Sequence, residues 1–182
     1  MPAGGRPLWA AEHDAEGKTV FVGGRDGELW FLDIASLGIR RAGAHTDGIP
    51  SMVRDGQLLA TSSDDKTVAL WALPGPDLKL RTRAHDFLVN DLTVVDGAEG
   101  RELVTASSDG TVRRWSWPGV EPLETIDAAA LLGREVSLHA VAPLPGARRI
   151  LAGTWGSSLL ELTARDGRWS VKEHPVPSKA IY

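Results

Sequence analysis

Two segments of this chain each combine a histidine, a serine, an aspartate and a tryptophan at closely similar spacing. The two sets are His45, Ser63, Asp65 and Trp71, and His85, Ser107, Asp109 and Trp115. Serine, histidine and aspartate together are the residues that carry nucleophilic acyl transfer in many hydrolases. A catalytic serine must be free to attack a substrate, so this interpretation requires an exposed hydroxyl. The elements that hold the two sets therefore decide between a catalytic and a structural role.

Other catalytic patterns are missing from the sequence. The chain has no cysteine, which excludes disulfides, thiolate metal sites and a cysteine nucleophile. It has no phosphate-binding Gly-Lys-Ser/Thr loop with the required glycine spacing and no His-Glu-x-x-His pair. Carboxylates are numerous, but no pair stands out as an acid and base. We therefore assign no catalytic residue, no metal site and no cofactor.

The two segments are copies of one internal repeat. Residues 61–71 read TSSDDKTVALW and residues 105–115 read TASSDGTVRRW. Weaker copies extend to both ends, and the landmark positions 26, 65, 109 and 156 lie 39, 44 and 47 residues apart. Periods of about 40 to 45 residues, with short apolar strands between Gly and Asp turns, are typical of β-propeller blades. Four blades fit in the 182 residues.

Strand signals recur in the same order within each repeat. In the first repeat, apolar runs at 18–22 and 28–32 flank a Gly/Asp turn, which predicts an antiparallel meander. We expect an all-β chain in which residues 1–182 form a single unit of four four-stranded blades. The blades are expected at residues 5–42, 43–83, 84–126 and 134–174. One short helix is predicted at 127–133, with Asp127 as its N-cap and Gly133 as its C-cap.

The two middle repeats resemble the WD40-repeat family of β-propellers. In both, apolar residues follow the histidine at the fourth and seventh positions, a Ser-x-Asp-x-Thr-Val turn comes next, and the repeat closes on tryptophan. The departures are small, because only an alanine before the histidine, and Ala72 or Ser116 after the tryptophan, differ from the family pattern. The resemblance implies a propeller that recognises protein or peptide partners.

The resemblance also assigns a role to the two residue sets of the opening paragraph. In the family, the Trp, Ser, His and Asp of one blade form a buried hydrogen-bond chain, and such a chain pairs every polar group that it buries. These structural tetrads would be Trp71, Ser63, His45 and Asp65, and Trp115, Ser107, His85 and Asp109. A serine inside a blade cannot attack a substrate, so we favour the structural role over a hydrolase.

The outer repeats are degenerate, and this affects how the blades are held. The first repeat has Gly24 and Leu32 where the tetrad needs Ser and Trp, and the fourth has Thr154, Gly156 and Leu162. Neither repeat can complete a tetrad. We expect both blades to be held mainly by apolar packing.

Four blades are fewer than the seven or eight that commonly close a WD40-type ring. A half-ring would leave two open apolar faces, which a monomer would not keep in water. Two copies related by a two-fold axis would supply eight blades and cover both faces. We therefore expect a homodimeric eight-bladed propeller. A piece of a longer propeller, a hetero-oligomer and a self-closed four-bladed ring are the alternatives.

His13 and His139 occupy one equivalent position in the two outer repeats, where Met52 and Leu92 stand in the middle ones. One interpretation is that each is an interior histidine with its hydrogen bonds satisfied, or that the first strand is shifted. The other is that they meet at the seam between two chains and form a site for a metal or a partner. Two histidines alone are a weak metal signal.

Partners of the WD40 family usually dock on the rim where the histidine-bearing loop enters the innermost strand, beside the residue before the turn aspartate. Mapped onto this chain, the partner-binding candidates are Trp9, Arg25, Asp64, Leu88, Asn90, Glu135 and Trp155. Tryptophan beside arginine is typical of interface hot spots, so Trp9 and Trp155 stand out.

The function that we expect is non-enzymatic: a scaffold whose rim binds a protein or peptide ligand. The alternative is a small-molecule or catalytic site in the central channel or at the dimer seam. The net charge of −4 gives no general attraction for nucleic acid. No signal peptide or membrane span is apparent, so the expected location is cytoplasmic and no membrane partner is expected.

Overall fold

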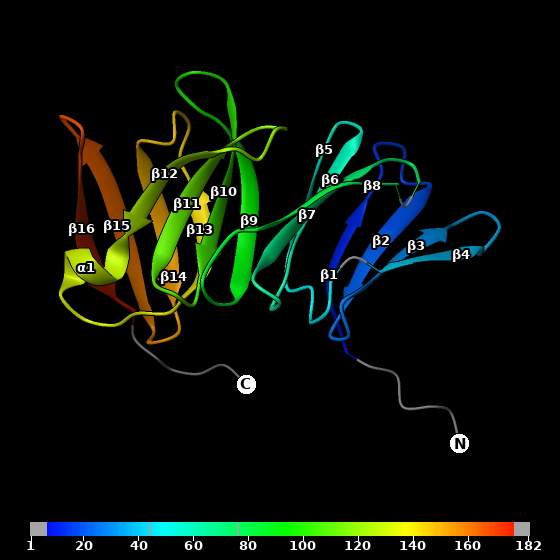
Figure 1. The fold of residues 1–182 in the computed structure, drawn as a ribbon, viewed down its shortest axis with the longest axis horizontal. Coiled ribbons are helices and arrows are strands. Elements are labelled where there is room, and N and C mark those ends of the chain that lie inside the picture. Colours follow the sequence, from blue (N-terminus) through cyan, green and yellow to red (C-terminus); the bar gives the residue numbers. More distant parts are fainter. Residues whose placement is uncertain (1–6, 44, 76, 177–182) are drawn as a thin grey trace. The chain divides into compact units, whose positions relative to one another are not determined.

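The computed structural model describes residues 7–43, 45–75 and 77–176. Within this part of the chain, the strands form four four-stranded antiparallel sheets, and one short helix follows the third sheet (Figure 1). The predicted all-β class with four four-stranded blades is confirmed. By its internal contacts the chain divides into two compact units, residues 1–92 and 93–182, which are described separately.

The first unit contains two sheets, with strand orders β1-β2-β3-β4 and β5-β6-β7-β8. The strands of the first sheet are β1 (Leu8–His13), β2 (Thr19–Gly24), β3 (Glu28–Asp33) and β4 (Ile39–Gly43). Those of the second sheet are β5 (Met52–Asp55), β6 (Leu58–Ser62), β7 (Thr67–Ala72) and β8 (Asp77–Arg83). Neighbours in sequence are neighbours in space, so both sheets are simple meanders.

The apolar pattern of the strands explains the core of the first unit. In β2, alternate residues are buried, whereas β7 is buried at four successive positions because both of its faces are covered. Phe21 and Phe31 pack edge to face at 5.2 Å between ring centroids, and Phe31 packs on Trp71 at 6.4 Å. The outermost strands β4 and β8 are rich in Arg and Lys, which protects an exposed sheet edge from pairing with another chain.

The second unit contains the other two sheets, with orders β12-β11-β10-β9 and β13-β14-β15-β16, and its boundary falls within β9. The third sheet comprises β9 (Val89–Asp96), β10 (Arg101–Ser107), β11 (Thr111–Ser116) and β12 (Pro122–Asp127). The fourth comprises β13 (Leu138–Pro143), β14 (Arg149–Thr154), β15 (Ser158–Arg165) and β16 (Arg168–Pro175). The core of the second unit contains Val104, Ile126, Leu138, Leu160 and Leu162, all almost fully buried.

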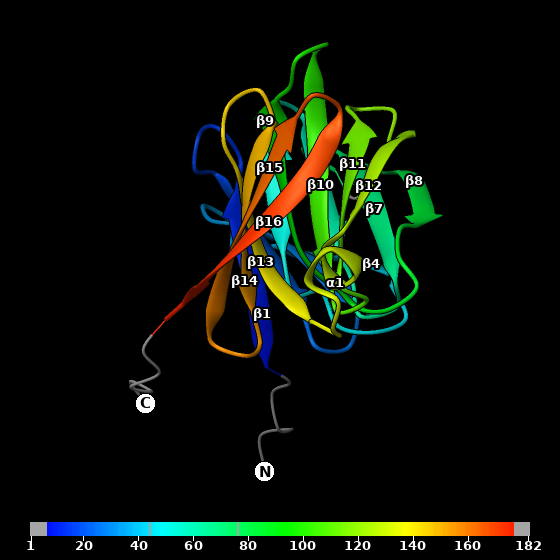
Figure 2. The same ribbon diagram turned by 90° about the vertical axis from the view of Figure 1, so that its left-hand side faces the viewer.

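The helix α1 (Ala128–Leu132) connects the third sheet to the fourth and lies beside β16 (Figure 2). The Asp127 side chain accepts a hydrogen bond from the Ala130 N–H, and Gly133 has the left-handed conformation with φ of 67°. Both capping residues are those that the sequence predicts.

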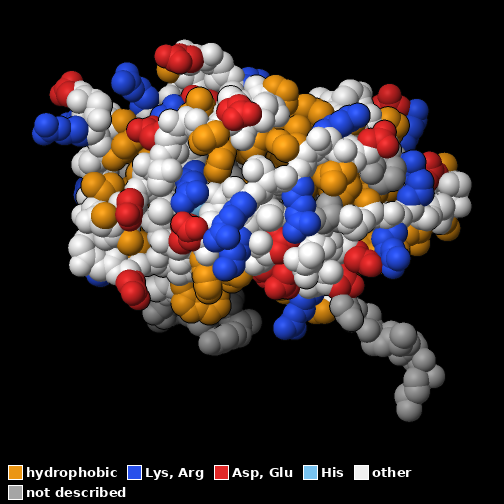
Figure 3. Space-filling model, in the orientation of Figure 1, with side chains coloured by type: hydrophobic (Ala, Val, Ile, Leu, Met, Phe, Trp, Pro, Cys, Tyr) orange, Lys and Arg blue, Asp and Glu red, His pale blue; other side chains and the backbone are white. Residues whose placement is uncertain are grey.

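Charged side chains of both signs are scattered over the face of the described residues that Figure 3 shows. A surface of this kind has no single-sign field to draw a polyanion. No helix in the described part of the chain is long and apolar enough to cross a membrane.

Candidate partner-binding site

A buried hydrogen-bond chain joins the strands of the second sheet. The Trp71 indole N–H donates to Thr61 Oγ1 at 3.1 Å, and His45 Nε2 lies 2.8 Å from the same hydroxyl. On its other side, His45 Nδ1 lies 3.3 Å from an Asp65 carboxylate oxygen and 3.0 Å from Thr67 Oγ1. Trp71, Thr61 and the His45 side chain are almost completely buried, so the chain pairs polar groups that water does not reach.

The hydroxyl of this chain belongs to Thr61, and the prediction of Ser63 in that role is wrong. Thr61 lies within β6, on the face that carries Trp71, whereas Ser63 follows the last residue of the strand. Ser63 Oγ donates to the Asp47 carbonyl at 3.0 Å and accepts from the Asp65 N–H at 3.0 Å, so it stabilises the turn. Because Ser63 is fully buried and both bonds are internal, it is not placed to act as a nucleophile.

The same correction applies to the third sheet. The Trp115 indole N–H donates to Thr105 Oγ1 at 3.0 Å, while Ser107 Oγ accepts from the Asp109 N–H at 3.0 Å. Thr105 stands ten residues before Trp115, as Thr61 stands ten residues before Trp71. Ser107 was therefore also predicted wrongly as the tetrad hydroxyl. His85, which belongs to the first unit, is 1% exposed.

Asp65 is the last group of this hydrogen-bond chain, and its carboxyl is ionised. Burial alone would raise the pKa of its carboxyl, but hydrogen bonds from His45, Thr67 and the Thr46 N–H outweigh burial and hold the pKa well below its usual range. Arg81 adds an ion pair at 2.9 Å from a partly exposed position. The carboxylate is thus committed to the blade and is not available to a partner.

The rim of the first unit brings together two of the predicted partner-binding residues, Trp9 and Asp64. A β-carbon built on Gly48 would lie 2.3 Å from Cζ3 of Trp9 and 3.1 Å from Oδ2 of Asp64. The indole and the carboxylate therefore both lie against Gly48, whose missing side chain provides the space. Trp9 is 43% exposed. Arg25 acts on Asp64 only through the electrostatic field, because no ion pair joins them.

Asp64 carries a charge that its surroundings do not compensate. Burial, then the neighbouring carboxylates of Asp47 and Asp65, raise the pKa of Asp64, and Arg25 offsets part of this effect. No hydrogen bond to the Asp64 carboxylate is formed within the described part of the chain. A half-buried carboxylate in this condition favours the approach of a cation.

The rim of the second unit is built around Trp155, which precedes β15 and is 78% exposed. Its indole lies against the imidazole of His139, with 4.8 Å between the ring centroids. His139 Nε2 lies 3.2 Å from Ser137 Oγ, and Ser137 Oγ donates to Ser108 Oγ at 3.0 Å. Burial lowers the pKa of His139, so the ring that supports Trp155 is uncharged at neutral pH.

A cavity of about 440 Å³ adjoins this rim. Its lining residues are Ser108, Asp109, Ala129, Glu135, Val136 and Ser137. The backbone N–H of Trp155 donates to the carbonyl of Ser137, one of these lining residues, at 3.1 Å, so Trp155 adjoins the cavity wall. The predicted residues Glu135 and Trp155 are thus connected through Ser137, which lines the cavity and also contacts His139.

The prediction that His13 and His139 share one position is wrong. The strand register places Ala11 opposite Val22 and Val141 opposite Ala152, as Met52 lies opposite Thr61. His139 is therefore the equivalent of Trp9, and His13 is the equivalent of Pro143. Residue counting failed because the link from first to second strand differs in length, being 14–18 in the first sheet and 56–57 in the second.

The remaining predicted residues are His13, Leu88 and Asn90. His13 is exposed and its Nδ1 lies 2.6 Å from the Asp14 carbonyl oxygen. Leu88 and Asn90 are half-buried on either side of Val89, the first residue of β9, whose N–H donates to the Ser63 carbonyl at 3.1 Å. Among the described residues, no group of three or more metal-ligating side chains comes together.

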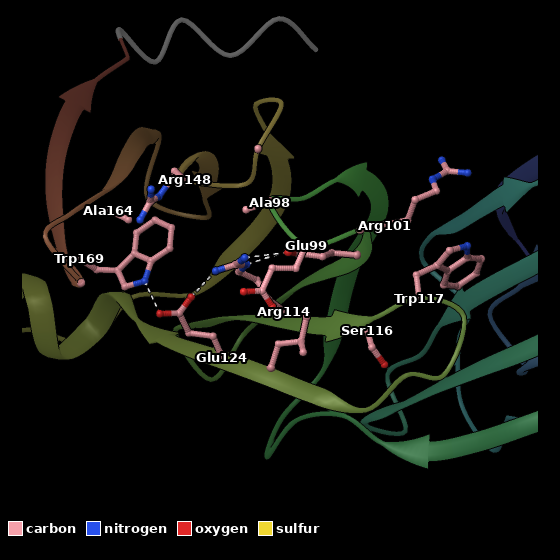
Figure 4. Close-up of a pocket in the computed structure, with 15 residues that line it drawn as sticks. Ala98, Glu99, Arg101, Arg114, Ser116, Trp117, Glu124, Arg148, Ala164 and Trp169 are labelled. Atoms are coloured by element: carbon pink, nitrogen blue, oxygen red, sulfur yellow. Dashed lines mark hydrogen bonds and ion pairs between the residues drawn. The ribbon is translucent and has the colours of Figure 1, made fainter.

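A second cavity, larger than the one beside Trp155, lies within the second unit and measures about 760 Å³; the sequence did not predict it (Figure 4). An ion triad forms its wall. Arg114 donates to both carboxylate oxygens of Glu102, at 2.8 Å each, and forms an ion pair with Glu124. The Trp169 indole N–H donates to the other Glu124 oxygen at 2.8 Å. In Figure 4, Arg101 and Trp117 lie at the other end of the cavity, away from Arg114.

A signal for this triad was present in the repeat alignment. Glu102, Arg114 and Glu124 stand where the second sheet has Leu58, Leu70 and Leu80, because Arg114 pairs with Glu124 in the register in which Leu70 pairs with Leu80. Three charges at three leucine positions mark a local difference between the two best repeats. None of the sequence-predicted site residues lines this cavity.

Comparison with known proteins agrees with these observations. The family model "WD domain, G-beta repeat" matches residues 39–72 and 78–116. Among solved structures, the crystal structure of the WD40 beta propeller domain of Doa1 is similar, with a TM-score of 0.73 and 18% sequence identity over 92% of this chain. The match covers 54% of that chain, so this protein spans about half its length. A search of curated protein sequences gave no match. Residues 39–72 and 78–116 are thus WD40 repeats, and the four sheets have the fold of WD40 propeller blades.

Proposed function

We propose that this chain is a non-enzymatic binding platform that recognises a protein or peptide partner on its rim. The observation that carries the proposal is Trp155, a large aromatic side chain that is 78% exposed yet held in place by His139. A tryptophan fixed before binding loses little side-chain freedom when a partner covers it. Exposed tryptophans of this kind are the residues that dominate binding energy in protein interfaces.

The interiors of the WD40 repeats support a non-catalytic role. The histidine, threonine and aspartate of the second sheet are committed to one internal hydrogen-bond chain. Ser63 and Ser107 are fully buried in turns. The residues that could have suggested a hydrolase therefore make the blade rigid, and the rim supplies the contacts.

A library of random peptides displayed on phage tests this proposal directly. Peptides selected on the wild-type protein should lose binding to Trp155→Ala or to Trp9→Ala, since truncating a central tryptophan commonly costs about 2 kcal/mol or more. Trp169→Phe, which changes a tryptophan away from both rims, should retain binding. Selected peptides that bind both rim variants as well as the wild type would refute rim recognition.

We further propose that two copies of the chain complete one propeller. The chain supplies four four-stranded sheets and matches 54% of a solved WD40 propeller domain, so two copies would supply a full set of blades. Light scattering coupled to size-exclusion chromatography should then give a mass near twice 19.5 kDa. A monomeric mass for the purified chain would rule out the homodimer. A cytoplasmic location stays a prediction from the sequence.

The second candidate function is small-molecule binding, and the cavity of about 760 Å³ favours it by its size. The charges of the triad on its wall, however, satisfy one another. Both oxygens of Glu102 and both of Glu124 already accept hydrogen bonds from Arg114 or Trp169. We therefore interpret the triad as a structural replacement for the three leucines that occupy the equivalent positions of the second sheet.

A further inference from the structure

The cavity beside Trp155 carries charge of one sign. Its lining includes two carboxylates, Asp109 and Glu135, and no lysine or arginine. Asp109 accepts hydrogen bonds from Thr111, whereas the Glu135 carboxylate has no hydrogen bond or ion pair within the described residues. The adjacent cation, Arg134, is paired with Glu173 at 2.6 Å. Glu135 thus presents a negative charge that the second unit itself does not neutralise.

Trp155 adds an aromatic surface to this charge. One side of its indole rests on the neutral His139 ring, and most of the remaining surface is open to solvent. The face of an indole attracts ammonium and guanidinium groups. The Ser108 and Ser137 hydroxyls between the two features can accept N–H hydrogen bonds from the same group.

We propose that the site formed by Trp155, Glu135 and the adjoining cavity binds a lysine or arginine side chain of the partner. This inference rests on the proposed rim recognition and specifies its chemistry. The cation would lie on the indole face and pair with the carboxylate, while the aliphatic stem covers the apolar wall of Val136 and Ala129. The partner's binding segment is therefore basic.

The rim of the first unit shows the same combination independently. Trp9 and the Asp64 carboxylate meet over Gly48, and the Asp47 carboxylate is a close negative neighbour. Arg25 reduces the local negative field without pairing with Asp64. An exposed tryptophan beside an uncompensated carboxylate thus occurs in both units.

The site can be probed with single side chains. We would titrate the ¹⁵N-labelled full chain with N-acetyl-arginine methylamide and follow the seven indole N–H signals of the tryptophans. The control ligand is N-acetyl-citrulline methylamide, which has nearly the same shape without the charge. We expect a saturable shift of the Trp155 signal with the arginine derivative and a shift at least several-fold weaker with citrulline. Equal responses to the two ligands, or no response to either, would overturn the proposal.

Variants then assign the contacts. Glu135→Gln and Trp155→Ala should each weaken binding of the arginine derivative by about two- to fivefold, the range expected of exposed ion pairs and exposed cation–π contacts. Because Trp155→Ala removes the reporter, its binding is read from the remaining amide signals. Glu121→Gln, an exposed carboxylate in the turn before β12, is the matched control and should bind as the wild type. An equal loss for Glu121→Gln would show non-specific attraction and contradict a defined site.

The displayed peptide library separates this inference from the function on which it rests. Rim-dependent peptides enriched in lysine and arginine, with selection lost in Glu135→Gln, would support both. Rim-dependent peptides without that enrichment would leave the platform intact and refute the basic segment. A library that yields no rim-dependent peptide would refute the platform itself.

Discussion

The ion triad of the second unit predicts that Arg114→Leu alone lowers the stability of the protein, whereas replacing all three charged residues with leucine does not. Arg114→Leu removes both hydrogen bonds of the Glu102 carboxylate, whose side chain is only 6% exposed. Gly97 packs closely against this carboxylate, since a β-carbon built there would lie 2.1 Å from Oε1. Glu124 keeps its bond from Trp169 and is partly exposed. The loss of stability in Arg114→Leu therefore comes mainly from the Glu102 carboxylate, which is left buried without its hydrogen-bond donor.

Breaking a buried ion pair by removing one partner typically costs about 3 to 5 kcal/mol. For a chain of this size, about 1 kcal/mol shifts the melting temperature by about 2 to 4 °C. Arg114→Leu should thus lower the melting temperature by about 10 °C, as measured by circular dichroism, and reduce the urea midpoint in parallel.

The triple variant Glu102→Leu, Arg114→Leu and Glu124→Leu reproduces the leucines of the second sheet. Replacing a buried ion network with apolar residues is often neutral or stabilising by about 1 to 4 kcal/mol. Against this, the Trp169 indole N–H loses its acceptor, at about 1 kcal/mol or more. The triple variant should therefore lie within about 2 kcal/mol of the wild type.

The exposed pair between Arg149 and Glu161 provides the control for the triad. Arg149 is 54% exposed, so Arg149→Leu should cost less than about 1 kcal/mol. A triple variant as unstable as Arg114→Leu, or a harmless Arg114→Leu, would refute the reasoning from burial.

Four further predictions concern the first unit. Thr61→Val should cost about 2 to 4 kcal/mol in urea unfolding, more than Ser63→Ala, because it leaves the Trp71 and His45 nitrogens unpaired; the reverse order would restore Ser63 to the tetrad. The depressed pKa of Asp65 means that its ionised form adds stability above about pH 4, which is lost as the pH falls toward the folded-state pKa. Asp65→Asn should therefore lower the melting temperature at pH 7 and flatten its fall between about pH 4 and pH 2, and an unchanged acid profile would contradict this. Gly48→Ala should move the Trp9 indole, seen as a changed indole N–H shift, while the melting temperature changes little, since the clash is with a movable ring; an unchanged Trp9 signal would contradict the contact. Because the pKa of Asp64 is raised, its ionised form is disfavoured in the folded chain, so Asp64→Asn should raise the melting temperature at pH 7 and not below about pH 3, and a loss of stability at pH 7 would refute the assigned field.

The repeat pattern predicted the fold because each β-propeller blade repeats the same residue pattern in the sequence. The turn aspartate, the closing tryptophan and the apolar alternation recur at four places, and the four sheets follow them. The helix was predictable for a different reason, since Asp127 and Gly133 satisfy opposite ends of one short turn. Both inferences rest on local spacing that tertiary structure does not alter.

The errors arose where spacing alone cannot show on which side of a strand end a residue falls. Ser63 and Thr61 differ by two positions and would share a face in an ideal strand, but β6 ends at Ser62 and the chain turns. His13 and His139 were misaligned because the links between strands vary in length. The triad at Arg114 escaped notice because an isolated charge in a strand normally faces solvent, and only the paired register shows that three charges meet.

The two kinds of polar residue in this chain differ in whether the fold satisfies them. In the second sheet, the His45, Thr61 and Asp65 side chains are bonded to one another, and this pairing stabilises the blade. At the rims, the carboxylates of Asp64 and Glu135 have no such bonds within the described residues, and burial and the neighbouring carboxylates raise the pKa of Asp64. A fold selected for stability alone would replace Asp64 with a neutral residue. An unpaired carboxylate beside an exposed tryptophan, present once in each unit, is accounted for when the missing partner is a cation supplied by another molecule.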